Sequence, residues 1–285
     1  MRKLWDKLSN FKSQEGQALL IIVLIMVVAT TVGLSIISRT VTNLRTAENQ
    51  QSSQKALAAA EAGVEQAMKT NSSIQSSFLS GTSYTTSITM AQASANTAFF
   101  LNGGDSIYKN DGGTIWITPY SADSSKLFVT TWTGNLTVYW GSSSDVCTNN
   151  LSNTMAALET VVLLGPKASP SVKTYVFDPC TDRKAVDNLN GAIGSGATLD
   201  TNFGRRTFPY SATISINQGL MIKVIPLYAD TFVAAKANID LPVQGSFISS
   251  VGSSGTTQRK ITVFQGYPEI PSELFPYSLL ILPNE

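Results

Sequence analysis

The chain has 285 residues, and its 20 lysines and arginines against 19 aspartates and glutamates give a net charge of +1. This balance argues against nucleic-acid binding, because no excess of positive charge is available to neutralise phosphates. The sequence has no histidine and only two cysteines, which excludes histidine-based metal sites, Ser-His or Cys-His catalytic centres and a four-cysteine zinc site. We therefore expect no enzyme activity, no metal and no cofactor. With 43% hydrophobic residues the chain can form a folded core.

The first feature along the chain is an uncharged apolar run. No residue between Gln17 and Ser38 is charged, and Ala18–Ile37 is nearly all apolar. This length matches the roughly 20 residues that a helix needs to cross a bilayer. Basic residues precede the run, so the positive-inside rule predicts a single-pass inner-membrane protein with its N-terminus in the cytoplasm and its remaining chain exported. An ordinary cleaved signal peptide is the alternative, although its apolar region is shorter.

The apolar run continues into a region of good helix formers without proline. We expect one helix over residues 17–69, with a length of roughly 80 Å, crossing the membrane at residues 18–37. A break near Gln50–Ser53 is the alternative. In the second half, apolar residues recur at helical spacing and predict a stripe that docks on a globular domain. That stripe consists of Leu57, Ala60, Val64 and, at its end, Met68 or the adjacent Ala67.

The N-terminal segment resembles a known family. A basic leader ends in Glu15–Gly16, the uncharged run starts at once, and the helix passes into the sequence AAAEAG. In this combination the segment is similar to the class III signal peptides of type IV pilins, and specifically to the PilX-type N-terminal family of minor pilins and pseudopilins, as in uncultivated small-genome bacteria. The resemblance implies that prepilin peptidase removes residues 1–16, cutting between Gly16 and Gln17.

One departure from the family pattern bears on the role of the chain. Most pilins carry glutamate at the fifth position of the mature chain, and counting from Gln17 that position is Ile21. That carboxylate is thought to pair with the N-terminal amine of a neighbouring subunit, which is a costly charge pair in lipid. Its absence favours a minor subunit of the tip or of initiation over the major filament protein. A surface-anchored binding protein or adhesin that never polymerises remains the alternative.

The resemblance also implies the partners. These are prepilin peptidase, other pilins, the inner-membrane assembly platform and membrane lipid, and the chain would move from the membrane to a pilus or the cell surface. Apolar side chains of the membrane helix would exchange lipid for neighbouring helices. The residues expected to pack in this way are Leu19, Leu20, Ile21, Ile22, Val23, Leu24, Val27, Val28, Leu34 and Ile37.

The rest of the chain predicts a β-rich, mainly antiparallel domain, so the fold class is α+β. Residues 70–113 form a Ser/Thr/Gly-rich connecting region, and residues 114–285 form the globular domain, with a possible subdomain boundary at 185–206. A turn at Thr133–Gly134 could close a hairpin. The expected strands are Thr114–Tyr120, Lys126–Trp132, Asn135–Trp140, Leu158–Leu164, Val172–Phe177, Tyr210–Ile216, Leu220–Tyr228, Thr231–Ala235, Gly245–Val251, Lys260–Gln265 and Tyr277–Leu282.

The two cysteines suggest a disulfide. Cys147 and Cys180 each follow a predicted strand, and an even pair in an exported domain favours an oxidised state over free thiols. Closing a loop of about 33 residues would stabilise the fold by about 3–4 kcal/mol in the chain-entropy model.

Overall fold

A computed structural model places a long helix and an antiparallel β-rich region, so the predicted α+β organisation is confirmed. The residues that it describes are 14–78, 81–147, 154–181, 183, 191, 193–201 and 204–269. The leader residues 1–13 and the predicted strand Tyr277–Leu282 lie outside them.

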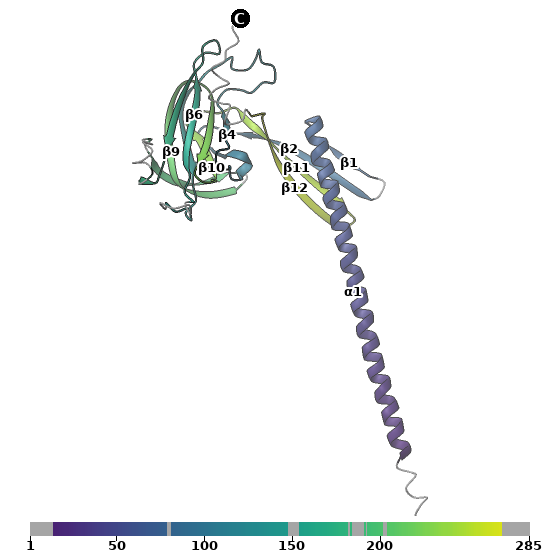
Figure 1. The fold of residues 1–285 in the computed structure, drawn as a ribbon. Coiled ribbons are helices and arrows are strands. Elements are labelled where there is room, and N and C mark those ends of the chain that lie inside the picture. The colour runs from purple at the N-terminus through teal and green to yellow at the C-terminus, as the bar shows by residue number, and fades with distance from the viewer. Residues whose placement is uncertain are drawn as a thin grey trace, which may run out of the picture. The chain divides into compact units, whose positions relative to one another are not determined.

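The long helix α1 spans Gln14–Thr70 without interruption (Figure 1). Its 57 residues correspond to about 86 Å, and there is no break at Gln50–Ser53. The helix persists because it contains no proline and because its second half is rich in alanine and other strong helix formers. It ends where Asn71 adopts a left-handed conformation with φ of 49°.

The chain divides into two compact units. The first takes α1 up to Gly63 together with Gln75–Thr85 and Val251–Lys260. The second takes Val64–Ile74, Thr86–Ser250 and the described residues from Ile261 onward. Each unit therefore combines segments that are far apart in the sequence.

The strands form two sheets. A four-stranded sheet has the order β1-β2-β11-β12, and an eight-stranded sheet has the order β3-β10-β5-β9-β6-β7, with β4 and β8 also paired to β9. The strands are β1 (Gln75–Ser77), β2 (Thr82–Gln92), β3 (Ala98–Phe100), β4 (Gly113–Trp116), β5 (Trp132–Trp140), β6 (Ala157–Leu164), β7 (Ser171–Phe177), β8 (Gly194–Thr201), β9 (Gly204–Leu227), β10 (Val233–Ala237), β11 (Val243–Ser254) and β12 (Thr257–Gly266). A short 3-10 helix, η1 (Leu101–Gly104), follows β3.

Strand β9 organises the larger sheet (Figure 1). Along its first half this 24-residue strand pairs with β5 and β8, and along its second half with β4 and β6, always antiparallel. The two halves were predicted as separate strands, Tyr210–Ile216 and Leu220–Tyr228. They are joined through Gln218, whose φ of 55° takes up the irregularity in the pairing at Gly219 without ending the strand.

The second half of β9 is covered on both faces. Ile222 and Val224 belong to the main hydrophobic cluster, which also contains the fully buried Trp140. The alternate residues Met221 and Ile225 belong to a second cluster. Because side chains alternate across a strand, these two clusters occupy opposite faces of the sheet. This double coverage explains why apolar residues here occupy consecutive positions on both sides of the buried Lys223 rather than alternating with polar ones.

The predicted strand Lys126–Trp132 is wrong, because residues 121–131 form turns and bends and β5 begins only at Trp132. The Asp123 carboxylate accepts hydrogen bonds from the backbone N–H and the hydroxyl of Ser125. Such local bonds favour a turn over a strand. Phe128 nevertheless packs against the second hydrophobic cluster, from a left-handed conformation with φ of 58°.

The predicted hairpin at Thr133–Gly134 is also wrong, because both residues lie inside β5 at an irregularity in its pairing with β9. A Cβ at Gly134 would lie 2.7 Å from the Trp132 ring and 2.8 Å from the Asn238 Oδ1 atom. Glycine is therefore needed for close packing inside a strand rather than for a chain reversal.

The Ser/Thr/Gly-rich region 70–113 contains β1, β2 and β3. Strand β2 is 11 residues long, and its threonines and tyrosine suit a pleated surface. In the segment 185–206, the described part forms β8 and the start of β9, which pair with each other.

Candidate functional site

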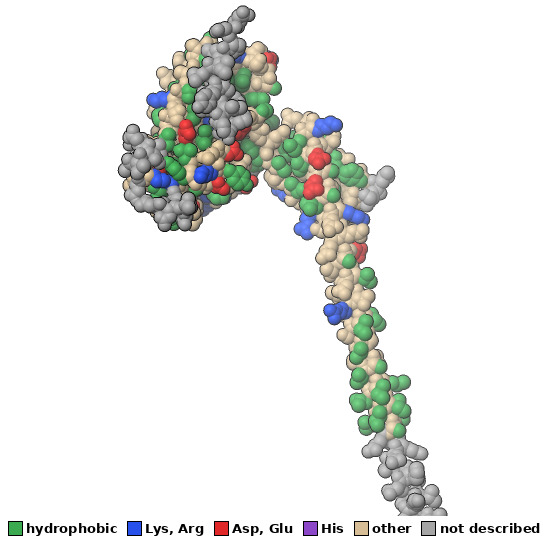
Figure 2. Space-filling view, in the orientation of Figure 1, with side chains coloured by type: hydrophobic (Ala, Val, Ile, Leu, Met, Phe, Trp, Pro, Cys, Tyr) green, Lys and Arg blue, Asp and Glu red, His purple; other side chains and the backbone are tan. Residues whose placement is uncertain are grey.

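The first half of α1 exposes its apolar side chains on all sides. The side chains between Leu19 and Ile37 that were predicted to pack against other helices are 53–68% exposed. In Figure 2 hydrophobic side chains protrude around this stretch of the helix. Among the described residues, α1 is the helix that is long and apolar enough to cross a membrane. An apolar surface of this extent is not stable in water, so it requires lipid or other helices as its surroundings.

The few polar side chains in this stretch satisfy themselves within the helix. The Thr30 hydroxyl donates to the Met26 carbonyl at 2.6 Å, and the Thr31 hydroxyl donates to the Val28 carbonyl at 2.8 Å. These bonds lower the cost of placing hydroxyl groups in an apolar environment. No atom outside the local helix backbone lies within 4 Å of a Cβ built at Gly33, so a neighbouring helix could approach closely there.

Two residues at the start of α1 flank the predicted leader-cleavage site. Gly16 and Gln17 both lie in the first turns of the helix, which begins at Gln14. Ile21, at the position where most pilins have glutamate, is 54% exposed on the helix surface. The exposed apolar surface therefore begins directly after the predicted cleavage point.

The middle of α1 is polar and also uncovered. Thr40, Thr42 and Thr46 each donate a hydroxyl to the carbonyl four residues earlier, at 2.9 Å. The Arg259 guanidinium of β12 then donates from Nε to the Ser53 hydroxyl at 2.8 Å. This bond joins β12 to α1 within the same compact unit.

Within that unit, the helix and β11 approach each other backbone to backbone. A Cβ built at Gly252 would lie 2.0 Å from the Ala56 carbonyl oxygen and 2.5 Å from the Ala60 nitrogen. Ala56 and Ala60 are fully buried. Only glycine on the strand and alanine on the helix leave room for this contact.

In the second unit, the end of α1 packs by larger side chains. Val64 and Ala67 form a cluster with the buried Ile248 of β11. Ile261 and Val263 of β12 pack against the same cluster, as does Ile88 of β2. The last two turns of α1 are thus covered by the four-stranded sheet.

The structure changes the docking stripe that the sequence predicts. Ala60 and Val64 are buried, but Leu57 and Met68 are 42% and 44% exposed, so they do not form the contact. Near Leu57 the reason is the close approach of β11 to Ala56 and Ala60, which leaves room only for small side chains. Ala67, the alternative to Met68 on the predicted stripe, is fully buried, whereas sequence reasoning missed Ala56, which lies one helical turn before Ala60.

The two cysteines are joined. The Cys147–Cys180 disulfide has a Cα–Cα distance of 5.5 Å. The neighbouring Asp178 holds this region in place, because its carboxylate accepts a bond from the Cys180 N–H at 2.9 Å and forms a bidentate ion pair with Arg183 at 2.7 and 2.9 Å. Among the described residues, no group of three or more His, Cys, Asp or Glu side chains could hold a metal ion.

The comparisons with known proteins identify the helical segment. Residues 15–65 match the family model described as PilX N-terminal, which covers most of α1 and ends near the start of its docked last turns. No curated protein and no solved structure matches the chain. The N-terminal part of the chain is therefore similar to the N-terminal segment of PilX-type pilins, whereas no comparison covers the β-rich part.

Proposed function

We propose that this chain, whose N-terminal segment is of the PilX pilin type, is a minor pilin or pseudopilin that takes part in the assembly, initiation or tip of a type IV pilus-like filament. The observation that carries the proposal is the apolar first half of α1, which is exposed all round yet continuous with a helix that docks on a folded domain. A subunit of a helical filament core needs this combination, because its helix must leave lipid and pack against other helices.

The mechanism is assembly rather than catalysis. Prepilin peptidase would cut between Gly16 and Gln17 on the cytoplasmic side, and the mature helix would exchange lipid for the helices of other pilins at the assembly platform. Burial of the apolar side chains is conserved in that exchange, so the transfer has little net cost. The β-rich domain would remain outside the membrane. Ile21 supports a minor rather than a major subunit, because it cannot form the charge pair of major pilins.

The second candidate is a surface-anchored binding protein that does not polymerise. The polar and uncovered middle of α1, between Arg39 and Ser53, favours it, because such a stretch could serve as a stalk that lifts a binding domain from the membrane. This protein would keep residues 1–16, whereas a processed pilin would lose them.

Intact mass and N-terminal sequencing of the membrane-fraction protein, expressed with and without a prepilin peptidase, test the proposal. We expect a chain that starts at Gln17 only when the peptidase is present, and a Gly16→Ala variant should remain uncut. A chain that starts at Met1 in both hosts would contradict pilin-type processing and favour the surface-anchored protein.

A further inference from the structure

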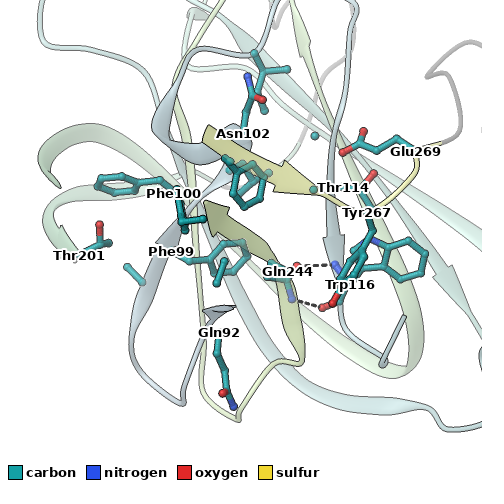
Figure 3. A pocket seen from close by; sticks show the side chains of 18 of the residues that line it. Gln92, Phe99, Phe100, Asn102, Thr114, Trp116, Thr201, Gln244, Tyr267 and Glu269 are labelled. Carbon is teal, nitrogen blue, oxygen red and sulfur yellow. Dashed lines mark hydrogen bonds between the residues drawn. The ribbon is translucent and has the colours of Figure 1, made fainter. Parts of the chain in front are cut away.

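The second compact unit contains a pocket that the filament role does not use. Its volume is about 700 Å³, which lies within the usual range for small-molecule sites. Figure 3 shows Phe99 and Phe100 on one side of the pocket and Tyr267 and Glu269 on the other. Its walls come from β2, β3, η1, β4, β8, β11 and the end of β12. A pocket built from so many separate segments is held by the fold rather than by one mobile loop.

Aromatic rings supply much of the lining. One of them, Tyr108, is 67% exposed and has no role in the core. Tyr267 is held firmly, because its ring stacks on Tyr120 at 4.4 Å and meets Trp116 edge-on at 6.1 Å. The aromatic lining residues are Phe99, Phe100, Tyr108, Trp116, Phe247, Phe264 and Tyr267. Rings with one free face offer flat apolar platforms, and the tyrosine hydroxyls add polar ends.

A strained turn presents an amide at the same pocket. Asn102 in η1 has a left-handed conformation with φ of 50°, and the next residue, Gly103, has φ of 66°. A Cβ at Gly103 would lie 2.6 Å from the Cβ atom of Phe264, so the turn is pressed against the aromatic wall. The Asn102 side chain donates from Nδ2 to the Ser106 carbonyl at 3.2 Å. Its Oδ1 atom has no partner among the described residues and remains available to accept a bond from a ligand.

The charged groups that line the pocket are acidic, and one of them has a printed cationic partner among the described residues. Three carboxylates line it, and no lysine or arginine is among its described lining residues. Glu269 pairs with the buried Lys223 at 2.5 Å, and Asp200 lies opposite Arg205 in the β8–β9 pairing. Asp111 accepts a bond from the Gly112 N–H at 2.8 Å. The pocket therefore offers several hydrogen-bond acceptors and, among its described lining residues, no cation.

These features select one class of ligand. An anionic ligand would meet carboxylates without a free cation, and a purely apolar one would bury carboxylate and amide groups without partners. A strongly cationic ligand would meet Glu269 already paired with Lys223 and would leave much of the aromatic lining uncovered. A neutral carbohydrate matches both properties of the lining, because its C–H faces stack on aromatic rings and its hydroxyls donate to carboxylate and amide oxygens.

We propose that this pocket binds a neutral oligosaccharide, with Tyr108 and Tyr267 as stacking platforms and with Asn102 and Asp111 as hydrogen-bond partners. Gln244 takes no direct part, since its amide already bonds the backbone N–H and carbonyl of Trp116 at 2.9 and 2.7 Å. The binding site lies in the β-rich part of the chain, so it does not depend on whether the helix enters a filament.

A glycan array followed by calorimetry tests the proposal on the full-length chain, purified in a detergent that has no sugar headgroup. The probes are neutral gluco-, manno-, galacto- and N-acetylglucosamine oligosaccharides, with sialyllactose, a sulfated oligosaccharide and an oligolysine peptide as comparison arms. We expect binding to at least one neutral oligosaccharide and to none of the charged probes.

Two variants tie binding to this pocket. Asn102→Gly keeps the left-handed conformation and removes the amide, and Tyr108→Ala removes an exposed ring. Each should weaken binding at least about tenfold without changing thermal unfolding. Asn71→Gly is the matched control, because Asn71 is exposed, has φ of 49° and does not line the pocket.

Three results would overturn the proposal. The first is no binding of any neutral oligosaccharide at millimolar concentration. The second is binding only to a sialylated, sulfated or cationic probe. The third is neutral-glycan binding that both pocket variants leave unchanged, which would place the ligand elsewhere on the chain.

Discussion

The first half of α1 and the eight-stranded sheet are both rich in Leu, Ile and Val, yet these side chains are exposed in the helix and buried in the sheet. In the sheet, side chains such as Leu136 and Ile222 are fully buried. In the helix, side chains such as Leu19 and Leu24 are more than half exposed. The sheet therefore buries its apolar side chains within the chain, whereas the first half of α1 needs lipid or other helices to bury its own. The difference supports the proposal that the helix makes the intermolecular contacts.

A second contrast lies within α1 itself. Its exposed half carries large aliphatic side chains, whereas its docked half buries mainly alanines, with Ala56 and Ala60 against the backbone of Gly252. Hydrophobicity alone would predict that the first half is the more buried one, whereas within this chain it is the more exposed one. Close approach, rather than apolar volume, determines which part of the helix belongs to the folded domain.

The largest effect is expected from a charged residue placed in the exposed half of the helix. Val27→Arg should cost about 3 kcal/mol in membrane insertion and abolish incorporation into surface filaments, because an arginine there has no partner. Val41→Arg is the matched control, since Val41 is also exposed on α1 but lies beyond the apolar run. Immunoblots of membrane and sheared surface fractions measure the effect. Normal amounts of Val27→Arg in the sheared fraction would contradict the proposed role.

Removing the disulfide tests the β-rich region, whose stability should not depend on lipid or other helices. Replacing both Cys147 and Cys180 by serine should lower the free energy of unfolding by about 3–4 kcal/mol, because the bond closes a loop with a sequence separation of 33 residues. Membrane association should not change, since the apolar helix is untouched. Chemical denaturation of the purified chain measures the loss, with the reduced wild-type protein as the control. Equal stability of the oxidised wild type and the variant would refute a stabilising role for the bond.

The contact between helix and strand predicts a smaller loss. Gly252→Ala should destabilise the chain by about 1–3 kcal/mol, because the new Cβ would press on the backbone of Ala56 and Ala60. Leu57→Ala is the control and should change stability by less than about 0.5 kcal/mol, since Leu57 is exposed. Thermal unfolding compares the two. A larger loss of stability for Leu57→Ala than for Gly252→Ala would contradict this account and support Leu57 as a docking residue, as the sequence predicted.

The smallest expected effect is a pH dependence of the sheet. Burial raises the pKa of the Glu159 carboxyl above its ordinary value of 4.5. The folded state therefore retains this proton to a higher pH than the unfolded chain, and the stability gained below pH 4.5 is lost as the pH rises through the folded pKa. Glu159→Gln should remove this decline, and Glu65→Gln, on the exposed surface of α1, should not. Parallel pH dependences of wild type and Glu159→Gln in thermal unfolding would contradict the assignment.

Much of the fold could be predicted from local patterns. The continuous helix, β6, β7 and the strands of the C-terminal part follow from periodicity and from turn residues, which act over short distances. The prediction that Gly134 closes a hairpin failed. Gly134 looked like a turn residue but serves close packing with Trp132, and the docked alanines depend on a strand about 190 residues later in the chain.

The pocket could not be predicted either. Its lining comes from segments between Thr89 and Glu269, and only the topology brings them together. By contrast, the exposed apolar surface of the helix is a local property of one segment, so its extent could be predicted from the sequence alone. The sequence of this chain does not specify which lipid or helices cover that surface.

Photo-crosslinking from α1 tests most directly the central claim that its exposed half packs against other pilin helices. A benzophenone amino acid at Val27 in cells that assemble filaments should capture other pilin subunits, whereas the same probe at Met68, exposed at the other end of the helix, should not. A peptidase-dependent, pilin-containing product from Val27 alone is the predicted result. Val27 probes that yield no protein adduct in filament-producing cells would contradict the claim and leave α1 as a membrane anchor.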